Sequence, residues 1–415
     1  MPRLALAMAW GGICSAMVYL FIGAGLALQY GVRNALIGMV LAVIAFGLLC
    51  GFLARYAART GMSSAVLSQA MLGRWGGAVA TLILCATGIY YAVFEGSVLA
   101  VAMSKVIPGL GYGAAALVVV AYSTPLVFGS VQNWINKLNG VLLPFYLAGI
   151  AALVWASFAR QGGSLDLARV GPTDPEAPFG WWFCMSTYLG VLVMAMCTMD
   201  FARFGRPEDA RWHSRWTFGM PFYLVTYLMN GVVGIMVVAT LEAATISETA
   251  VVDASLALLG GGIGLVWVFV SQTRVNTANF LIGTLNLQAF LIEIGDWRLS
   301  KRLCALLVGL ITFTLMRSTD IFSHLIVALN WQAVFTTAWV GVALSFVATR
   351  RQELSQPIVG YAGLGAWVLS ALIGCGTLAF GGQSGRYWYP IVTVATAIAA
   401  HRLLSAFDHG RARST

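Results

Sequence analysis

The chain has 415 residues, of which 60% are hydrophobic and 9% are charged, and its 24 Lys and Arg against 15 Asp and Glu give a formal charge of +9. Soluble domains carry about 25% charged residues, so this composition excludes a soluble globular protein and indicates residence in a lipid bilayer. In a membrane protein an excess of basic residues belongs to the loops that set topology, and we expect no nucleic acid partner.

Apolar runs between polar or charged breaks predict about twelve membrane-spanning helices, since about 20 apolar residues cross the hydrocarbon core. We expect one transmembrane domain over residues 1–415, all α-helical and polytopic. The twelve expected spans are 9–30, 34–54, 77–104, 113–131, 139–158, 180–200, 218–240, 260–290, 303–318, 325–348, 358–380 and 388–406.

Basic residues gather in alternate loops and predict the orientation of the chain. Arg55, Arg59 and Arg74 lie between the second and third spans, and the run 203–215 carries four more arginines. Loops rich in Lys and Arg stay in the cytoplasm. We therefore expect a multi-pass protein of the plasma (inner) membrane with both termini cytoplasmic and the acidic loops 162–180 and 241–254 outside.

Signals for cofactor or enzyme chemistry are missing from the sequence. The seven cysteines lie within or beside apolar runs without metal-type spacing, and the four histidines are scattered near segment ends. There is no P-loop, glycine-rich nucleotide fingerprint or nucleophile–base constellation. We expect no cofactor, no metal and no enzymatic activity.

Two ionisable residues lie deep within expected spans: Glu95 in the third and Arg274 in the eighth. A charge at the centre of a bilayer costs about 2.5–3.5 kcal/mol on insertion scales, so such residues usually face a polar pathway or a partner. Glu95 is a candidate proton carrier or substrate acceptor. Arg274 keeps its proton at physiological pH, so it can serve only as a standing positive charge. The alternative for Glu95 is a structural salt bridge or a helix-packing hydrogen bond, and for Arg274 it is a fixed pair that holds two helices together.

A polar stripe follows the eighth span. Gln272, Asn276 and Asn279 stand at i, i+4 and i+7, which places them on one face of a helix. These side chains are candidates to form hydrogen bonds with the polar edge of a ligand. Alternatively, they form hydrogen bonds between helices, worth about 0.6 kcal/mol each. Tyr91, one turn before Glu95, is a candidate stacking platform, with plain helix packing as the alternative.

Three segments resemble the nucleobase–cation symporters of the purine–cytosine permease type. DFARFGR after the sixth span is similar to that family's D-[FY]-x-R-[FY] signature. ARTGMSSAVLSQAMLGRWG between spans two and three, and SQTRVNTANFL in span eight, resemble two further elements of the family in the same order.

The resemblance implies the leucine-transporter-type fold, in which five helices are repeated in inverted topology and two helices follow. The first repeat would be 9–158, the second 180–348 and the extra helices 358–406. Helices one and six would be broken near the bilayer midplane, with the ligand between helices one, three, six and eight.

The resemblance also identifies departures. The family's stacking Trp in span three is matched by Tyr91, and the second aromatic wall falls near Val191, so Tyr188 is the candidate replacement. Sodium-using members place two hydroxyl residues where this chain has Arg274 and Val275. A guanidinium there implies that Arg274 replaces the sodium ion.

These observations predict a permease for a nucleobase or related small planar heterocycle, of the cytosine, purine, allantoin, hydantoin or hydroxymethylpyrimidine type. Transport would be sodium-independent, and either proton-coupled through Glu95 or uncoupled. The substrate would contact Tyr91, Glu95, Gln272, Asn276, Asn279 and Tyr188. An amino-acid or amine transporter on the same fold, and a membrane sensor without transport activity, are the alternatives.

Overall fold

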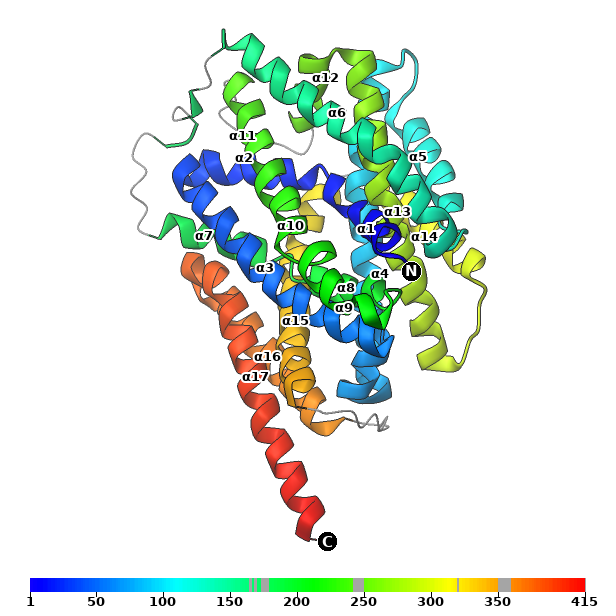
Figure 1. The fold of residues 1–415 in the computed structure, drawn as a ribbon, viewed down its shortest axis with the longest axis vertical. Coiled ribbons are helices and arrows are strands. Elements are labelled where there is room, and N and C mark those ends of the chain that lie inside the picture. The colour runs from blue at the N-terminus through cyan, green and yellow to red at the C-terminus, as the bar shows by residue number, and fades with distance from the viewer. Residues whose placement is uncertain are drawn as a thin grey trace.

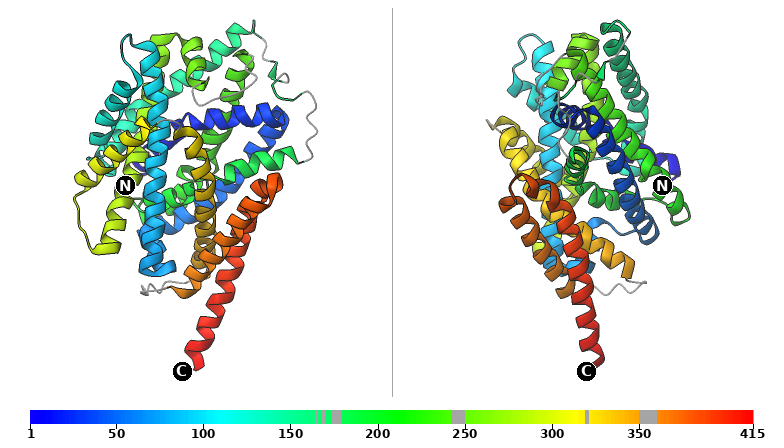
Figure 2. Two further views of the ribbon diagram at one scale, coloured as in Figure 1. Left: turned by 180° about the vertical axis from the view of Figure 1, so that it is seen from behind. Right: turned by 90° about the vertical axis from the view of Figure 1, so that its left-hand side faces the viewer.

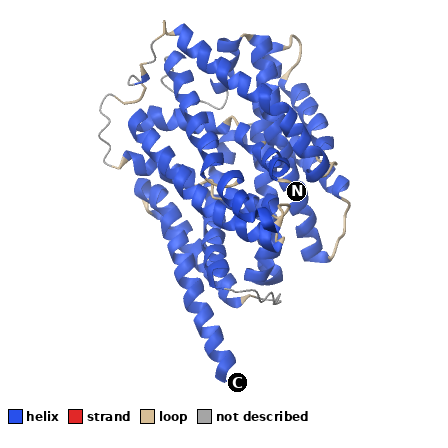
Figure 3. Cartoon of the chain, viewed as in Figure 1, coloured by secondary structure: helices blue, strands red, loops and turns tan. Residues whose placement is uncertain are grey.

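The computed structural model describes residues 1–163, 166–167, 170–172, 179–241, 250–318, 321–349 and 360–414. Within these ranges the regular elements are all helices, and no strand occurs (Figure 3). Most of both predicted outer loops, and Arg350 and Arg351 of a predicted cytoplasmic loop, lie outside the described residues. The all-helical class predicted from composition is confirmed.

The first half of the chain holds five of the expected spans. The first is a bent pair, since α1 (Arg3–Gly11) and the short η1 (Ile13–Ser15) meet α2 (Val18–Tyr30) at 46°. The others are α3 (Val32–Thr60), α4 (Ser64–Val106), α5 (Tyr112–Leu126), and η2 (Val131–Ile135) running into α6 (Asn136–Arg160).

The second half begins with another bent pair, α7 (Gly180–Leu189) and α8 (Val193–Ala202), which meet at 45°. Both helix breaks expected from the resemblance are therefore confirmed. The chain continues through η4 (Pro207–Asp209), α9 (Ala210–Trp212), η5 (His213–Thr217), α10 (Met220–Tyr223), η6 (Leu224–Met229), α11 (Asn230–Leu241), α12 (Ala250–Leu259), α13 (Gly261–Gly295), α14 (Lys301–Arg317), α15 (Ile321–Thr349), α16 (Tyr361–Phe380) and α17 (Gly382–Ser414).

The described part of each expected span coincides with a helix or a bent pair, which makes this a multi-pass membrane protein. Seven described helices are long and apolar enough to cross a bilayer, or nine if each bent pair is one span. Helices α5, α14 and α17 occupy the other three expected ranges without meeting that test. Helix α12 was not expected, because its apolar residues adjoin a polar loop.

The centre of the molecule is built on α4 and α13, which pack along each other (Figures 1 and 2). Gly88 allows this approach, because a Cβ there would lie 2.5 Å from the backbone nitrogen of Gly283 and 2.8 Å from the carbonyl of Asn279. Helix α4 also bends at Gly73, whose φ of 75° is in the region that favours glycine. Helices α16 and α17 pack together at one edge of the molecule (Figure 1).

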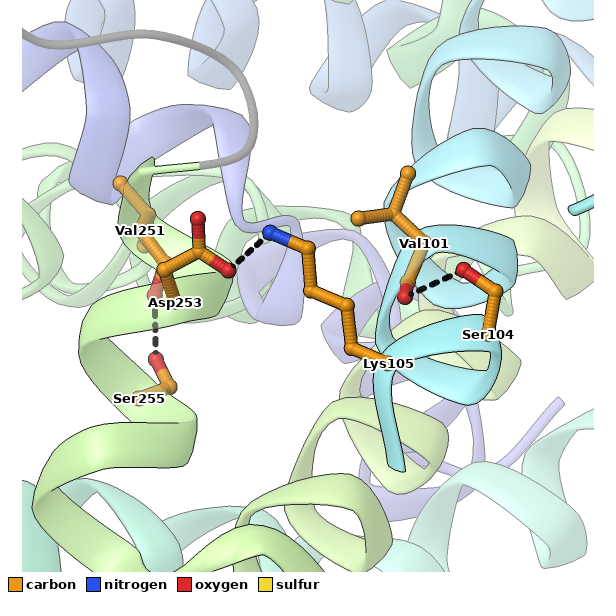
Figure 4. Close-up of polar contacts among 6 residues, drawn as sticks. All are labelled: Val101, Ser104, Lys105, Val251, Asp253 and Ser255. Atoms are coloured by element: carbon orange, nitrogen blue, oxygen red, sulfur yellow. Dashed lines mark hydrogen bonds and ion pairs between the residues drawn. The ribbon is translucent and has the colours of Figure 1, made fainter. Parts of the chain in front are cut away.

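Polar contacts join helices near both ends of the bundle. Near one end, Lys105 of α4 pairs with Asp253 of α12, and both side chains are about half exposed (Figure 4). Near the other, the buried carboxylate of Asp200 on α8 accepts from the Ser64 amide at 2.9 Å, the Ser64 hydroxyl at 2.7 Å and the Asn286 amide group at 3.2 Å. The second cluster therefore ties the broken sixth helix to both α4 and α13.

Candidate functional site

The break in the first helix lies at the middle of the bundle, and side chains from other helices satisfy its backbone groups. Asn230 of α11 donates to the carbonyl of Cys14 at 2.7 Å. Ser271 of α13 donates to the carbonyl of Ser15, whose own hydroxyl donates to Gly12 at 2.7 Å. Since exposed backbone is tolerated at membrane depth only where partners satisfy it, these bonds maintain the break.

Arg274 of α13 is 1% exposed and reaches the end of α1. One terminal nitrogen of its guanidinium donates to the carbonyl of Gly11 and the other to the carbonyl of Asn139 on α6, each at 2.7 Å. The guanidinium carbon also lies 5.5 Å from the centre of the Tyr146 ring. The C-terminal end of a helix carries a partial negative charge, so the positive charge meets complementary groups.

Glu95 of α4 is fully buried and reaches the start of α2. Its Oε1 accepts from the backbone amide of Val18 at 3.4 Å, while its Oε2 has no hydrogen-bond partner among the residues that the structure describes. The first amides of a helix lack partners within the helix and carry a partial positive charge. The carboxyl group therefore faces the positive end of α2.

Glu95 and Arg274 lie at opposite ends of the same helix break. Within the described residues no ion pair joins them, because each binds backbone groups instead. The two residues therefore do not pair with each other in the described part of the chain, and a hydrogen bond between helices remains the alternative to a functional role for Glu95. The break therefore lies between a buried carboxyl group and a buried guanidinium, and each of them binds different backbone groups.

A pocket lies beside this break, between both broken helices, α4 and α13. Polar and flat groups on its wall come from Tyr19, Thr87, Tyr91, Glu95 and Asn279. The remaining lining residues are Ile13, Ala16, Val18, Gly88, Val191, Val193, Met194, Cys197, Val275 and Ile282. Such a largely apolar pocket with a few convergent polar groups is typical of a small-molecule site.

Of the three residues in the predicted polar stripe of α13, only Asn279 lines the pocket. Asn279 lines the pocket and donates to the side-chain oxygen of Asn276 at 3.4 Å. Asn276 and Gln272 are fully buried behind the lining. In the described part of the chain, the side-chain nitrogen of Asn276 and both amide atoms of Gln272 have no partner within hydrogen-bond distance. Buried polar groups are nearly always paired, so these atoms point to a further polar partner at the site.

The two predicted aromatic walls are placed differently. Tyr91 lines the pocket, one helical turn from Glu95. Tyr188 is fully buried and packs against Tyr227, with ring centres 4.7 Å apart, and it is not among the pocket residues. Arg274 likewise lies outside the lining, where it holds the backbone at the break. A stacking role for Tyr188 remains a prediction.

Several site features could not be read from the sequence. The partners of Arg274 and Glu95 are backbone groups of Gly11, Asn139 and Val18, which no side-chain pattern marks. Gln332 of α15 was also missed, although it donates to the hydroxyl of pocket residue Thr87. A Gln inside an apolar run was the available signal for it.

Solved structures with the same fold are numerous, although their sequences differ widely. Mhp1, a nucleobase-cation-symport-1 family transporter, in a closed conformation with bromovinylhydantoin bound, has a TM-score of 0.74 at 17% identity over 97% of this chain and 92% of its own. A Na⁺-coupled sialic acid symporter in a substrate-bound outward-open state has a TM-score of 0.69 at 10% identity, covering 98% and 90%. The Eremococcus coleocola manganese transporter has 0.58 at 15% identity, covering 99% and 96%.

No protein-family model matches the chain, and no curated protein sequence matches it either. At these identities the likeness to solved structures establishes the fold alone. The predicted leucine-transporter-type fold is thus confirmed. The exact bounds of the two inverted repeats and the roles of the pocket residues remain predictions.

Proposed function

We propose that this protein is a secondary transporter that moves a nucleobase or a related small planar heterocycle across the membrane by alternating access. One observation carries the proposal. Both broken helices, α4 and α13 meet at one pocket, and in that pocket Tyr91 presents a ring beside a fully buried Glu95 with an unpaired carboxyl oxygen. The shared fold with transporters such as Mhp1 supports this reading.

The pocket chemistry suits a flat molecule with N–H groups on its edge. Tyr91 would stack on the ring, since aromatic faces pair well with planar heterocycles. Oε2 of Glu95 would accept a ring N–H, and Asn279 would pair with a donor–acceptor edge. Gln272, Asn276 and Tyr188 would support the ligand from behind the lining. Cytosine, purines, allantoin, hydantoins and hydroxymethylpyrimidine have this chemistry.

The arrangement around Arg274 supports sodium-independent transport. Its guanidinium binds the Gly11 carbonyl at the end of α1, so a permanent cation already neutralises that end of the break. Val275, the next residue, lines the pocket and offers no side-chain oxygen to an ion. We infer that Arg274 acts in place of a sodium ion. Coupling then rests on a proton carried by Glu95, or transport is uncoupled.

Uptake into proteoliposomes tests this proposal. A panel of labelled heterocycles of the named types is offered in sodium or potassium buffer, with and without a pH gradient. We expect saturable uptake of at least one compound, with equal rates in the two buffers. A strict sodium requirement would contradict the role given to Arg274. Ligand binding without uptake would favour a membrane sensor instead.

The coupling role is tested by Glu95→Gln against a matched control, Glu293→Gln. Glu293 is also a buried glutamate, but it lies on α13 away from the pocket, where Gln69 and Thr81 donate to its two oxygens. If Glu95 carries the proton, Glu95→Gln removes the response to the pH gradient and Glu293→Gln retains it. Equal responses of both variants to the pH gradient would contradict the coupling role of Glu95.

A further inference from the structure

The start of α2 behaves as an anion site that the protein fills with its own carboxylate. Helix α2 has 13 residues, and Met17, which precedes it, makes no side-chain cap. Glu95 takes that place from another helix, with Oε1 accepting from the Val18 amide at 3.4 Å. Helix N-termini favour anions because their partial charge is positive. At this one the amides of Tyr19 and Leu20 donate to the carbonyls of Ala16 and Met17, so the Val18 amide is the group that meets the carboxylate. The position that a ligand carboxylate would take at this helix end is thus already occupied by the Glu95 side chain.

A second carboxylate in the pocket would have no favourable partner. The lining contains no Lys, Arg or His, and Arg274 is engaged with the carbonyls of Gly11 and Asn139 outside it. While Glu95 is ionised, a second carboxylate beside it would be repelled, because like charges interact strongly where the local dielectric constant is low. Because Glu95 is fully buried, little water screens such a pair.

The remaining atoms at the site point to a hydrogen-bond donor as the ligand group. Oε2 of the fully buried Glu95 has no partner within hydrogen-bond distance among the described residues. An N–H of a neutral amide, imide or protonated amine would satisfy Oε2. A carboxylate, which only accepts hydrogen bonds, would not.

We infer that Glu95 is a charge-selectivity residue: it occupies the anion-binding end of α2, so the pocket takes neutral or cationic N–H donors and rejects molecules that carry a carboxylate. This deepens the proposed function and rests on it for the identity of the binding pocket. It also sets this chain apart from an amino-acid transporter, whose substrate carboxylate would bind at a broken helix end.

Chemical rescue tests the anion site without any knowledge of the substrate. Glu95→Ala opens space at the start of α2, and sodium formate is compared with formamide, its neutral counterpart, and with sodium gluconate, an anion too large to enter. We expect formate alone to raise the melting temperature of Glu95→Ala by several degrees. Neither the parent nor Asn279→Ala, which also shortens a polar pocket side chain, should respond.

Matched ligand pairs test the selectivity. Nicotinamide with nicotinate, and uracil with orotate, differ mainly in the carboxylate. We expect the parent to bind the neutral member of a pair at least tenfold more tightly, and Glu95→Gln to reduce that preference at least tenfold. If Glu95→Ala cannot be purified, this comparison decides the matter.

The outcomes separate the inference from the proposed function. Formate rescue in a protein that binds and transports no heterocycle would refute the proposed substrate class and keep the anion site. Formate that stabilises the parent, Glu95→Ala and Asn279→Ala equally, or fails to stabilise a folded Glu95→Ala, would overturn the inference. So would a parent protein that binds carboxylates as tightly as their neutral counterparts.

Discussion

The guanidinium of Arg274 donates to the backbone carbonyl of Gly11 at 2.7 Å and so ties α13 to the point where the first helix breaks. This contact places the positive charge of Arg274, which is costly to bury in a membrane span, at the partially negative C-terminal end of α1. It also explains how Arg274 is tolerated without an acidic partner. The same guanidinium also donates to the backbone carbonyl of Asn139 and so connects α13 to α6.

Removing this group should destabilise the protein. Arg274→Ala removes the guanidinium donor from the carbonyls of Gly11 and Asn139, and a hydrogen bond to a charged group is worth about 1.5–3 kcal/mol. We expect a clear fall in melting temperature in detergent, and a higher melting temperature in sodium than in potassium if an ion can take the vacated place. Arg298→Ala is the control, since both side chains of its pair with Asp296 are exposed and such a pair is worth about 0–1 kcal/mol. Similar losses in both variants would contradict the assigned role.

The ring of Tyr91 should determine ligand affinity more than its hydroxyl does. Tyr91→Phe keeps the aromatic face, whereas Tyr91→Ala removes stacking worth about 1–3 kcal/mol. For any heterocycle that the protein transports, we expect a Kd near the parent value for Tyr91→Phe and about tenfold or more above it for Tyr91→Ala. Isothermal titration calorimetry measures both. An unchanged Kd in Tyr91→Ala would move the stacking site elsewhere.

The contact of α4 with α13 should not tolerate a methyl group at Gly88. In Gly88→Ala the new carbon would meet backbone atoms of Gly283 and Asn279 at 2.5 and 2.8 Å, and overpacking of this kind costs about 1–3 kcal/mol. Gly96→Ala on the same helix is the control, because its nearest neighbour is the flexible Met316 side chain at 3.3 Å. We expect a lower melting temperature for the first variant only. Equal behaviour would show that the two helices can separate freely.

The buried carboxylate of Asp200 should hold the start of α4. Asp200→Asn places an amide nitrogen among the donors of Ser64 and Asn286, which leaves at least one of them unpaired. We expect faster hydrogen–deuterium exchange in the first turns of α4, with exchange in α16 unchanged. Asp253→Asn serves as the control, because that carboxylate is about half exposed. Unaltered hydrogen–deuterium exchange in Asp200→Asn would refute the role of Asp200 in holding the start of α4.

The ion pair of Lys105 with Asp253 should contribute little, despite its position between α4 and α12 (Figure 4). Exposed pairs are screened by salt and are typically worth about 0–1 kcal/mol. We expect Lys105→Ala to leave the melting temperature within about two degrees of the parent at high salt. A larger loss that persists at high salt would show that this end of the bundle depends on the pair.

The sequence alone determined the class of protein, the positions of the helices and which spans carry buried polarity. Length and hydropathy suffice for this because the bilayer imposes one span length and one internally bonded structure. Glu95, Tyr91 and Asn279 could be selected in the same way, since polar or flat side chains inside apolar spans are few. Their common pocket is present in the structure.

Only the tertiary structure decided what these residues contact. The sequence left open whether Glu95 and Arg274 pair. In the structure Glu95 meets the amide of Val18, and Arg274 meets the carbonyls of Gly11 and Asn139. Tyr188, the candidate second aromatic wall, packs on Tyr227 and is not among the pocket residues, and its stacking role remains a prediction. The physical reason is that backbone groups are the same at every residue, so a helix break exposes donors and acceptors that side-chain patterns do not encode.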